Sequence, residues 1–291
     1  MKKNKSDRVS QPLNLQQEAK LLPGYLLLVL WLVFTVVLLV WIFAASLSTS
    51  KDIYSGQVFS FNTGLHFENY ITAWKTQNVS LFFMNSVIYA GLALVGIQLI
   101  CAPAAYVLSR FRFAGNKLFK NCFILAMSIP SIMIILPLFS LATSLHLTGT
   151  RTLLVILYIC INVPFTTTFL LNFFGSLSHT YEEAAAIDGC SPIRTFWVIM
   201  MPLAQPGLVT VGIFNFLSVW NEYFMAMIFA SSDRLKNVGI GLFNMVQAMT
   251  SVGNMGGLFA AVIIVFMPTF IIYLFLSEKI IAGITAGGVK G

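Results

Sequence analysis

The sequence predicts an all-α membrane protein with six transmembrane helices, and composition is the first observation behind that prediction. Of the 291 residues, 58% are hydrophobic and only 9% are charged, whereas a soluble domain carries about 25% charged residues. The second observation is six uncharged runs, each long enough for a membrane-spanning helix, which needs about 20 apolar residues. These runs cover residues 21–50, 76–109, 121–150, 152–181, 195–221 and 237–277.

The distribution of lysine and arginine is the third observation. If the N-terminus is cytoplasmic, twelve of the 17 basic residues lie on the cytoplasmic side. Cytoplasmic loops carry the excess of basic residues in membrane proteins, so both termini are predicted to be cytoplasmic. The cytoplasmic set is Lys2, Lys3, Lys5, Arg8, Lys20, Arg110, Arg112, Lys117, Lys120, Arg194, Lys279 and Lys290. The outer set is Lys51, Lys75, Arg151, Arg234 and Lys236. This segregation explains the net charge of +7 without a nucleic-acid partner.

The six helices are expected over residues 24–46, 84–108, 118–142, 152–174, 205–230 and 258–277. The first apolar run is longer than the apolar core of a signal peptide, and its charged leader is extended, so it is interpreted as a retained helix. Residues 1–20 form the polar cytoplasmic leader. Residues 21–291 form one transmembrane domain.

Two segments, residues 47–83 and 231–257, are predicted to be sizeable outer loops. In the first, residues 67–74 indicate a small packed element that lies on the membrane surface. In the second, five glycines predict flexibility, and three methionines predict an adaptable apolar surface. The alternative for the second segment is a loop that only caps the helix bundle.

Polar residues inside the predicted helices are candidates for the lining of a hydrated pathway. Asn162 precedes Pro164 by two residues in the fourth helix, although amides in such helices more often bond to neighbouring helices. Glu222 is the only ionisable residue of the fifth helix, and a carboxylate inside the bilayer is costly. It lies about 26 Å along a helix that begins at Gln205. Glu222 therefore either lines a pathway beside Asn221 or reaches the outer surface.

Residues 181–202 are the longest polar interruption in the C-terminal half that still indicates ordered structure. Thr180 and Glu183 have the spacing of a capping box at a helix start. Gly189 stands where a helix commonly ends on a residue with positive φ. Ser191 and Pro192 have the residue types of an N-cap and a first helical position. The stretch therefore predicts two short helices joined by a sharp turn.

The same stretch resembles the EAA loop of permeases from ABC importers. The matching residues are Glu183, Ala184, Ala185, Gly189, Ile199 and Pro202. Met201 replaces the usual leucine, an apolar exchange that packing tolerates. A capped, alanine-rich helix can produce Glu-Ala-Ala by chance, but the spaced Gly, Ile and Pro are more restrictive. The resemblance implies that residues 178–206 are a cytoplasmic coupling loop seated in a cleft of a separate ATPase. The ATPase-coupling residues are then Glu182, Glu183, Ala184, Ala185, Asp188, Gly189, Ile199 and Pro202.

Three further stretches are similar to carbohydrate-importer permeases: residues 46–70, residues 220–223 and the C-terminal residues 282–291. Residues 277–279 depart from the family, which often has Gln-Arg-aromatic there. The resemblance implies the second permease of a maltose- or oligosaccharide-type importer, with the six-helix type I fold, in a bacterial inner membrane. Within the tail, residues 278–291, it assigns ATPase contact to Gly287, Gly288 and Lys290. In the loop 231–257 it implies contact with a binding protein through Asn244, Met245, Met249 and Asn254.

The implied machine contains this chain, a second permease, two ATP-binding subunits and an extracytoplasmic solute-binding protein. Gly288 and Lys290 superficially resemble a phosphate-binding loop, but Lys290 is not followed by Ser or Thr and no helix follows. ATP and Mg²⁺ are therefore expected on the partner ATPase, with no cofactor or metal in this chain. In the maltose type the partner permease and the binding protein chiefly hold the sugar.

Other functions were weighed against this one. A proton-coupled secondary transporter needs several intramembrane carboxylates, and a channel needs a charged ring or carbonyl filter. An intramembrane enzyme needs a nucleophile and base that converge, and His66, His146 and His179 lie in predicted loops without a carboxylate-and-serine arrangement. An ABC importer for a polyol, a glycerol-phosphate-like ester or a peptide stays open as an alternative.

Overall fold

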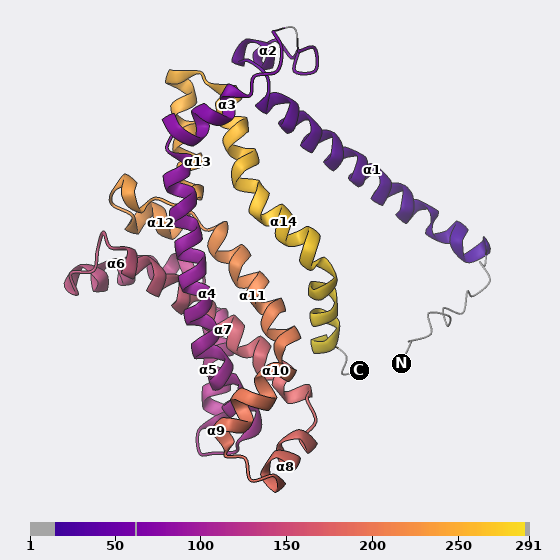
Figure 1. Cartoon of the computed structure of the whole chain (residues 1–291), viewed down its shortest axis with the longest axis vertical. Helices are drawn as coiled ribbons and strands as arrows, with labels where there is room; N and C mark the ends of the chain where they lie inside the picture. The colour runs from indigo at the N-terminus through magenta and orange to yellow at the C-terminus, as the bar shows by residue number, and fades with distance from the viewer. Residues whose placement is uncertain (1–14, 62, 289–291) are drawn as a thin grey trace.

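The computed structural model describes residues 15–61 and 63–288, and the regular structure in these ranges is helical (Figure 1). Among them, four helices are long and apolar enough to cross a membrane. They are α1 (Leu15–Ser46), α4 (Val79–Arg110), α7 (Arg151–Ser176) and α14 (Met255–Gly288). These helices confirm the first, second, fourth and sixth predicted ones and extend beyond them. Two bent helix pairs bring the possible crossings to six.

The third predicted helix is not continuous, so the prediction of one helix over residues 118–142 is wrong. The chain forms α5 (Asn116–Met127), a 3₁₀ turn η2 (Ser131–Ile134) and α6 (Ile135–Ser144), with a bend of 96° between the two halves. Pro130 causes the break, because proline has no amide hydrogen and disfavours helical backbone in the residue before it. As a result α6 projects sideways from the other helices (Figure 1).

The fifth predicted helix, residues 205–230, is also divided. Its parts are α11 (Gln205–Trp220) and α12 (Phe224–Phe229). The Asn221 side chain bonds back to the carbonyl of Leu217, 2.9 Å away, and the chain leaves the helix there. Asparagine often competes with helical hydrogen bonds in this way. Glu222 therefore lies in the break, so its predicted position inside a continuous helix is wrong.

Residues 231–257 are not the flexible loop that their glycines predicted. They contain the 3₁₀ turn η4 (Asp233–Leu235) and the helix α13 (Val238–Val252), which packs against α4 and α14. Close packing explains two of the glycines. A Cβ on Gly241 would lie 2.3 Å from the Phe82 ring, and a Cβ on Gly239 would lie 2.6 Å from Tyr223. These glycines therefore serve helix packing instead of loop flexibility.

The packed centre of the molecule is the contact between α4 and α7. Ala93 and Ala105 of α4 are fully buried, as are Leu154 and Phe174 of α7. Small residues let helix backbones approach closely in membrane proteins. α11 joins this pair at Gly207, where an added Cβ would lie 2.6 Å from the Phe173 ring.

Trp220 connects three helices near the end of α11. Its indole nitrogen donates to the carbonyl of Val265 in α14 at 3.1 Å. Its ring stacks on Phe216, 5.4 Å away, and meets Phe83 of α4 edge-on at 5.3 Å. Because the side chain is only 2% exposed, its polar N–H needs this internal partner.

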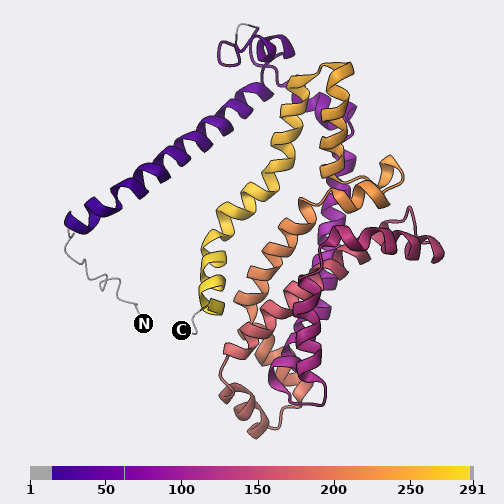
Figure 2. The same ribbon diagram turned by 180° about the vertical axis from the view of Figure 1, so that it is seen from behind.

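α1 diverges from the rest of the chain (Figures 1 and 2). Its most apolar stretch has no buried residue. Contact with α14 is made near its C-terminal end, where Trp41 meets Phe259 edge-on at 5.3 Å and Ala45 is buried. A helix satisfies its own backbone hydrogen bonds, so an apolar one is stable in hydrocarbon.

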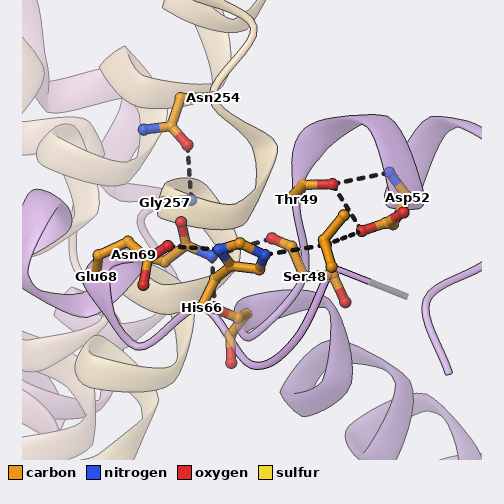
Figure 3. Close-up of polar contacts among 10 residues, drawn as sticks. Ser48, Thr49, Asp52, His66, Glu68, Asn69, Asn254 and Gly257 are labelled. Atoms are coloured by element: carbon orange, nitrogen blue, oxygen red, sulfur yellow. Dashed lines mark hydrogen bonds and ion pairs between the residues drawn. The ribbon is translucent and has the colours of Figure 1, made fainter. Parts of the chain in front are cut away.

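The segment after α1 folds into small elements: α2 (Ser50–Tyr54), α3 (Glu68–Ile71) and the π-helical turn η1 (Thr72–Thr76). The last two confirm the packed element expected over residues 67–74. Asn69 fixes the segment, because its amide donates to the carbonyls of Ser46 and Ser48 at 3.0 Å each (Figure 3). The segment, here called the α2 end, lies at the opposite end of the molecule from α8 and α9 (Figure 1).

A polar cluster inside the α2 end centres on Asp52, which is only 7% exposed. Its Oδ2 accepts the hydroxyls of Thr49 at 2.7 Å and Thr63 at 3.0 Å. His66 Nε2 lies 3.0 Å from the same Thr63 oxygen, and its Nδ1 contacts the Glu68 carboxylate (Figure 3). The expected absence of a carboxylate-and-serine arrangement at His66 stays a prediction, and the ring contacts a carboxylate and a threonine from nearby residues.

Donor and acceptor accounting fixes the proton positions in this cluster. Asp52 can only accept, so the Thr63 hydroxyl gives its hydrogen to Asp52 and must accept from His66. Thr49, Asp52, Thr63, His66 and Glu68 thus form one continuous chain of polar contacts that joins α2 to the start of α3.

We predict that Gly207→Ala destabilises the protein by about 1–3 kcal/mol, because its Cβ would overlap the Phe173 ring. Thermal unfolding of purified protein in detergent measures this. Gly91→Ala in α4 is the matched control, since no atom lies within 4 Å of its added Cβ. Equal melting temperatures for the two variants would contradict the packing of α11 on α7.

We further predict that acid loosens the α2 end. The hydroxyls of Thr49 and Thr63 lower the pKa of Asp52, and His66 lowers the pKa of Glu68. A carboxyl whose pKa is lower in the folded state than in the unfolded state stabilises the folded state when the pH is above the unfolded-state pKa. This stabilisation is lost as the pH falls through the folded-state pKa. Hydrogen exchange of amides in residues 47–68, corrected for intrinsic rates, should therefore accelerate below about pH 4.

Asp52→Asn should raise that exchange at neutral pH and flatten its dependence on acid. Asp233→Asn is the control, because Asp233 is an exposed acid outside this cluster that pairs with Lys236. If Asp52→Asn kept the wild-type pH profile, the cluster would not hold the segment.

Candidate functional site

The predicted helix–turn–helix of residues 181–202 is present at the end of the molecule opposite α2 (Figure 1). It consists of α8 (Thr180–Ile187), α9 (Pro192–Thr195), the π-helical turn η3 (Phe196–Met200) and α10 (Met201–Leu203). The stretch from Pro192 to Leu203 meets α11 at an angle of 73°. These elements therefore stand as a projection on the bundle.

Gly189 makes the turn, as its position predicts. Its φ of +74° is in the left-handed region, and the amide of Cys190 bonds to the carbonyl of Ala185 at 2.9 Å. That bond closes the helix end in the manner of a Schellman motif. Ser191 then caps α9 by accepting the amide of Arg194 at 3.4 Å, with Pro192 as first helical residue.

The predicted capping box of Thr180 and Glu183 does not form. The amides of Glu182 and Glu183 bond to the carbonyl of His179 at 3.1 Å, so the helix begins one residue earlier than the box requires. The Thr180 hydroxyl pairs with Ser178 Oγ at 2.8 Å. Glu183 is thereby left exposed and available to another molecule.

The projection also exposes apolar side chains that the sequence analysis did not single out. Ile187 is 87% exposed, and Ile193, Trp197 and Val198 are all at least half exposed. Together with Glu183 they form what we call the α8–η3 face. The sequence could have indicated this surface, since large apolar residues stand in a polar loop. An exposed apolar patch of this kind marks an interaction site.

Glu182 and Glu183 are neighbours in sequence but lie in different environments. The Glu182 side chain is 20% exposed and points to Arg110 at the end of α4, with Oε1 3.2 Å from Nε. Arg110 Nη2 donates to the carbonyl of Leu177 at 2.9 Å, and Nη1 lies 3.2 Å from His179 Nε2. The Arg110 side chain is only 3% exposed, and a buried charge requires such partners.

Arg110 is thus a site residue that sequence reasoning missed, because its partners lie about 70 positions further along the chain. His179 was expected to lie without a carboxylate-and-serine arrangement, and its ring has one carboxylate neighbour, since Nδ1 lies 3.3 Å from Glu182 Oε2. Local spacing of acids and bases carries no information about such a contact.

The remaining coupling-loop residues are placed as follows. Ala184, Asp188, Gly189 and Pro202 are exposed, Ile199 is half-buried and Ala185 is buried. The buried alanine faces the interior of the turn, where its carbonyl receives the Cys190 amide. The assignment of these residues to ATPase contact stays a prediction.

The candidate pathway residues Asn162, Asn221 and Glu222 all make hydrogen bonds within this chain. Asn162 is buried and donates to the carbonyl of Tyr158 at 2.8 Å. The Glu222 carboxylate accepts the amides of Met225 and Ala226 and, at 3.0 Å, the hydroxyl of Tyr158. Glu222 thus caps α12 and ties it to α7. Their role on a pathway is untested and stays a prediction.

The residues assigned to a binding protein lie on and after α13. Asn244 is exposed, whereas Met245 is buried against α14 and α4. Asn254 immediately precedes α14 and accepts the amide of Gly257 at 2.9 Å (Figure 3). The side chain of Met249 lies outside the described residues.

The predicted tail, residues 278–291, does not begin as a separate segment. α14 continues through Gly287 and Gly288, because residues 280–284 stay apolar and no proline follows Pro268. Lys290 lies outside the described residues. Contact of the tail with an ATPase stays a prediction.

Comparisons with known proteins place these features in context. Residues 99–284 match the family described as binding-protein-dependent transport system inner membrane component. The chain is 34% identical over 264 residues to the diacetylchitobiose uptake system permease protein NgcG of Streptomyces coelicolor, covering 91% of this chain and 87% of that protein. It is 28% identical over 274 residues to the galactooligosaccharides transport system permease protein GanQ of Bacillus subtilis, covering 94% and 96%.

A solved structure has the same fold. It is a chain from the crystal structure of a bacterial ABC transporter involved in the import of the acidic polysaccharide alginate. The TM-score is 0.76 at 24% identity, over 89% of this chain and 97% of that one. The predicted type I importer fold is therefore confirmed.

We predict that Gly189→Ala strains the turn between α8 and α9 by about 1–2 kcal/mol, because an L side chain is disfavoured at positive φ. The amide of Cys190, bonded to Ala185, should then exchange with deuterium about 5- to 30-fold faster. Gly175→Ala is the control, as nothing lies within 4 Å of its added Cβ. Unchanged exchange in Gly189→Ala would show that the turn does not need glycine.

Proposed function

We propose that this chain, which belongs to the family of binding-protein-dependent transport system inner membrane components, is the permease of a sugar importer. The chain is a membrane-spanning permease subunit of an ABC transporter, as the family and relatives of similar length establish. The proposal adds the solute: an oligosaccharide or a related sugar. It also adds the residues through which ATP hydrolysis drives import.

The observation that carries the coupling part of the proposal is the α8–η3 face. Glu183 and Ile187 are exposed on a helix that is closed by Gly189 and lies at one end of the bundle. An acid beside exposed apolar side chains suits a cleft in a partner that has a basic rim and an apolar floor. We assign that cleft to the ATP-binding subunit. ATP and Mg²⁺ would bind to that subunit, since this sequence contains no P-loop.

The sugar part of the proposal is supported by the relatives. NgcG serves diacetylchitobiose uptake and GanQ serves galactooligosaccharide transport, and both match almost the whole chain. Importers for a polyol, a glycerol-phosphate-like ester or a peptide are the alternatives that an uptake assay must compare.

The orientation follows from the same assignment. With α8 in the cytoplasm, Arg112, Lys117, Lys120 and Arg194 lie on the cytoplasmic side, which agrees with the excess of basic residues expected there. The α2 end, η4 and α13 then face outward, toward a solute-binding protein. A second, different permease and two ATP-binding subunits would complete the assembly. The uncovered apolar surface of α1 would contact lipid and the second permease.

Motion is proposed to begin at the α8–η3 face. Closure of two ATP-binding subunits would pull the projection as a rigid body. Because α10 leads into α11 and Arg110 holds α8 to α4, both helices would tilt with it. Rigid-body tilting of packed helices is an established means of alternating access.

We predict that Glu183→Ala lowers sugar uptake at least about tenfold, because it removes the exposed acid of the docking face and a lost charge-assisted contact is worth about 1.5–3 kcal/mol. Uptake of radiolabelled diacetylchitobiose and galactooligosaccharides into cells measures this, with membrane insertion checked by immunoblot. Lys117→Ala, an exposed charged residue outside the α8–η3 face, should retain uptake.

Two results would contradict different parts of the proposal. Full uptake by Glu183→Ala would remove the docking role of the α8–η3 face. Wild-type cells that take up neither sugar, but accumulate a labelled polyol, glycerol-phosphate ester or peptide, would overturn the sugar assignment and leave the permease assignment intact.

A further inference from the structure

Arg110 closes a ring of three side chains with His179 and Glu182. A guanidinium only donates, so His179 Nε2, 3.2 Å from Arg110 Nη1, must accept. The ring proton of His179 then lies on Nδ1, which faces Glu182 Oε2 at 3.3 Å. Each member of the ring therefore fixes the next, and the first turn of α8 is attached to the last residue of α4.

The other end of α4 is attached in a similar way to the segment before α13. Asn85 Nδ2 donates to the carbonyls of Arg234 and Lys236 at 2.9 Å each. The Tyr89 hydroxyl donates to the carbonyl between them at 2.8 Å. Three successive carbonyls of the segment are thus held by α4 side chains.

α7 reinforces this attachment at the same end. Arg151, the first residue of α7, donates to Asn85 Oδ1 at 3.0 Å. Asn85 is only 1% exposed, so its amide oxygen and nitrogen are both satisfied inside the protein. Loss of this side chain would leave several buried polar groups without partners, which is costly.

Between its two ends α4 is continuous. It runs for 32 residues, about 48 Å at 1.5 Å per residue. Its middle is fixed by packing on α7 and by Gln98, whose Nε2 donates to the carbonyl of Leu208 in α11 at 3.0 Å. By contrast, the α5–α6 pair and the α11–α12 pair are both interrupted.

We propose that α4 is a rigid link between the coupling helix α8 and the outer segment 234–238, with Arg110 and Asn85 as the positioning residues at its two ends. The inference rests on the proposed function, which places the ATPase at α8 and the binding protein at the outer side. A displacement of α8 then moves the segment 234–238 without passing through a break in a helix. In the reverse direction, docking of the binding protein reaches α8 and stimulates the ATPase.

The test uses the complete importer in liposomes: this chain, its partner permease, the ATP-binding subunits and the solute-binding protein. The readout is the stimulation of ATP hydrolysis by the binding protein, in complexes shown by gel filtration to be fully assembled. Arg110→Ala and Asn85→Ala should each lower the stimulation at least about fivefold, the lower bound of typical coupling between sites. Hydrolysis without the binding protein should persist in both variants.

The double variant decides whether the two residues share one link. Substitutions at distant sites normally have additive effects on free energy. If both residues belong to one link, the double variant should lose no more stimulation of ATP hydrolysis than either single variant. Arg112→Ala is the control, because Arg112 is an exposed arginine two positions beyond Arg110. Glu182→Gln, which removes the charge but keeps the shape, replaces Arg110→Ala if that variant does not assemble.

Normal stimulation in either assembled single variant would overturn the proposal. Losses that multiply in the double variant would also overturn it, because they would indicate two independent structural roles. The assay does not measure uptake, so a wild-type complex that responds to its binding protein without importing sugar would contradict only the sugar assignment.

Discussion

Backbone polar groups inside a bilayer must be satisfied within the protein, and this constraint explains the polar side chains at two irregular points of the fold. At the break after α11, Glu222 accepts the amides of Met225 and Ala226, while Asn237 donates to the carbonyl of Glu222. Asn85 likewise donates to two backbone carbonyls of the segment before α13. Polar residues that seem out of place in an apolar sequence thus support interruptions of the helices. Such interruptions let the chain place loops where a bundle of uninterrupted helices could not place them.

The sequence was sufficient for features that depend on local composition. Runs of apolar residues predicted the long helices, and the pattern around Gly189 and Ser191 predicted the turn after α8. It was insufficient where contacts between distant segments decide. Pro130 causes the break between α5 and α6, but the 96° angle between the two halves has no signal in the local sequence. The burial of Arg110 has no local signal, because its partners belong to another helix.

The pair Glu182 and Glu183 shows why a motif alone does not assign roles. Both acids lie in the first turn of α8, where the helix dipole favours negative charge. One turns inward to a buried arginine and the other faces solvent. Substitution of Glu182 therefore changes the attachment of α8 to its own chain, whereas substitution of Glu183 changes only what α8 presents to a partner. Effects of the two on transport need separate physical explanations.

The same distinction applies to the basic residues from which orientation was inferred. The Arg110 guanidinium is paired with Glu182 inside the protein, and Arg151 donates to Asn85 near the opposite end of α4. Counting such residues as free surface charge therefore overstates the charge on both sides. In the proposed orientation Arg110 lies on the cytoplasmic side, which basic residues favour, whereas Arg151 lies on the outer side. On either side the fixed fork of donors of a guanidinium can hold a loop to a helix end. Charge placement that first selects an orientation during insertion can therefore later serve as mechanical attachment within the folded permease.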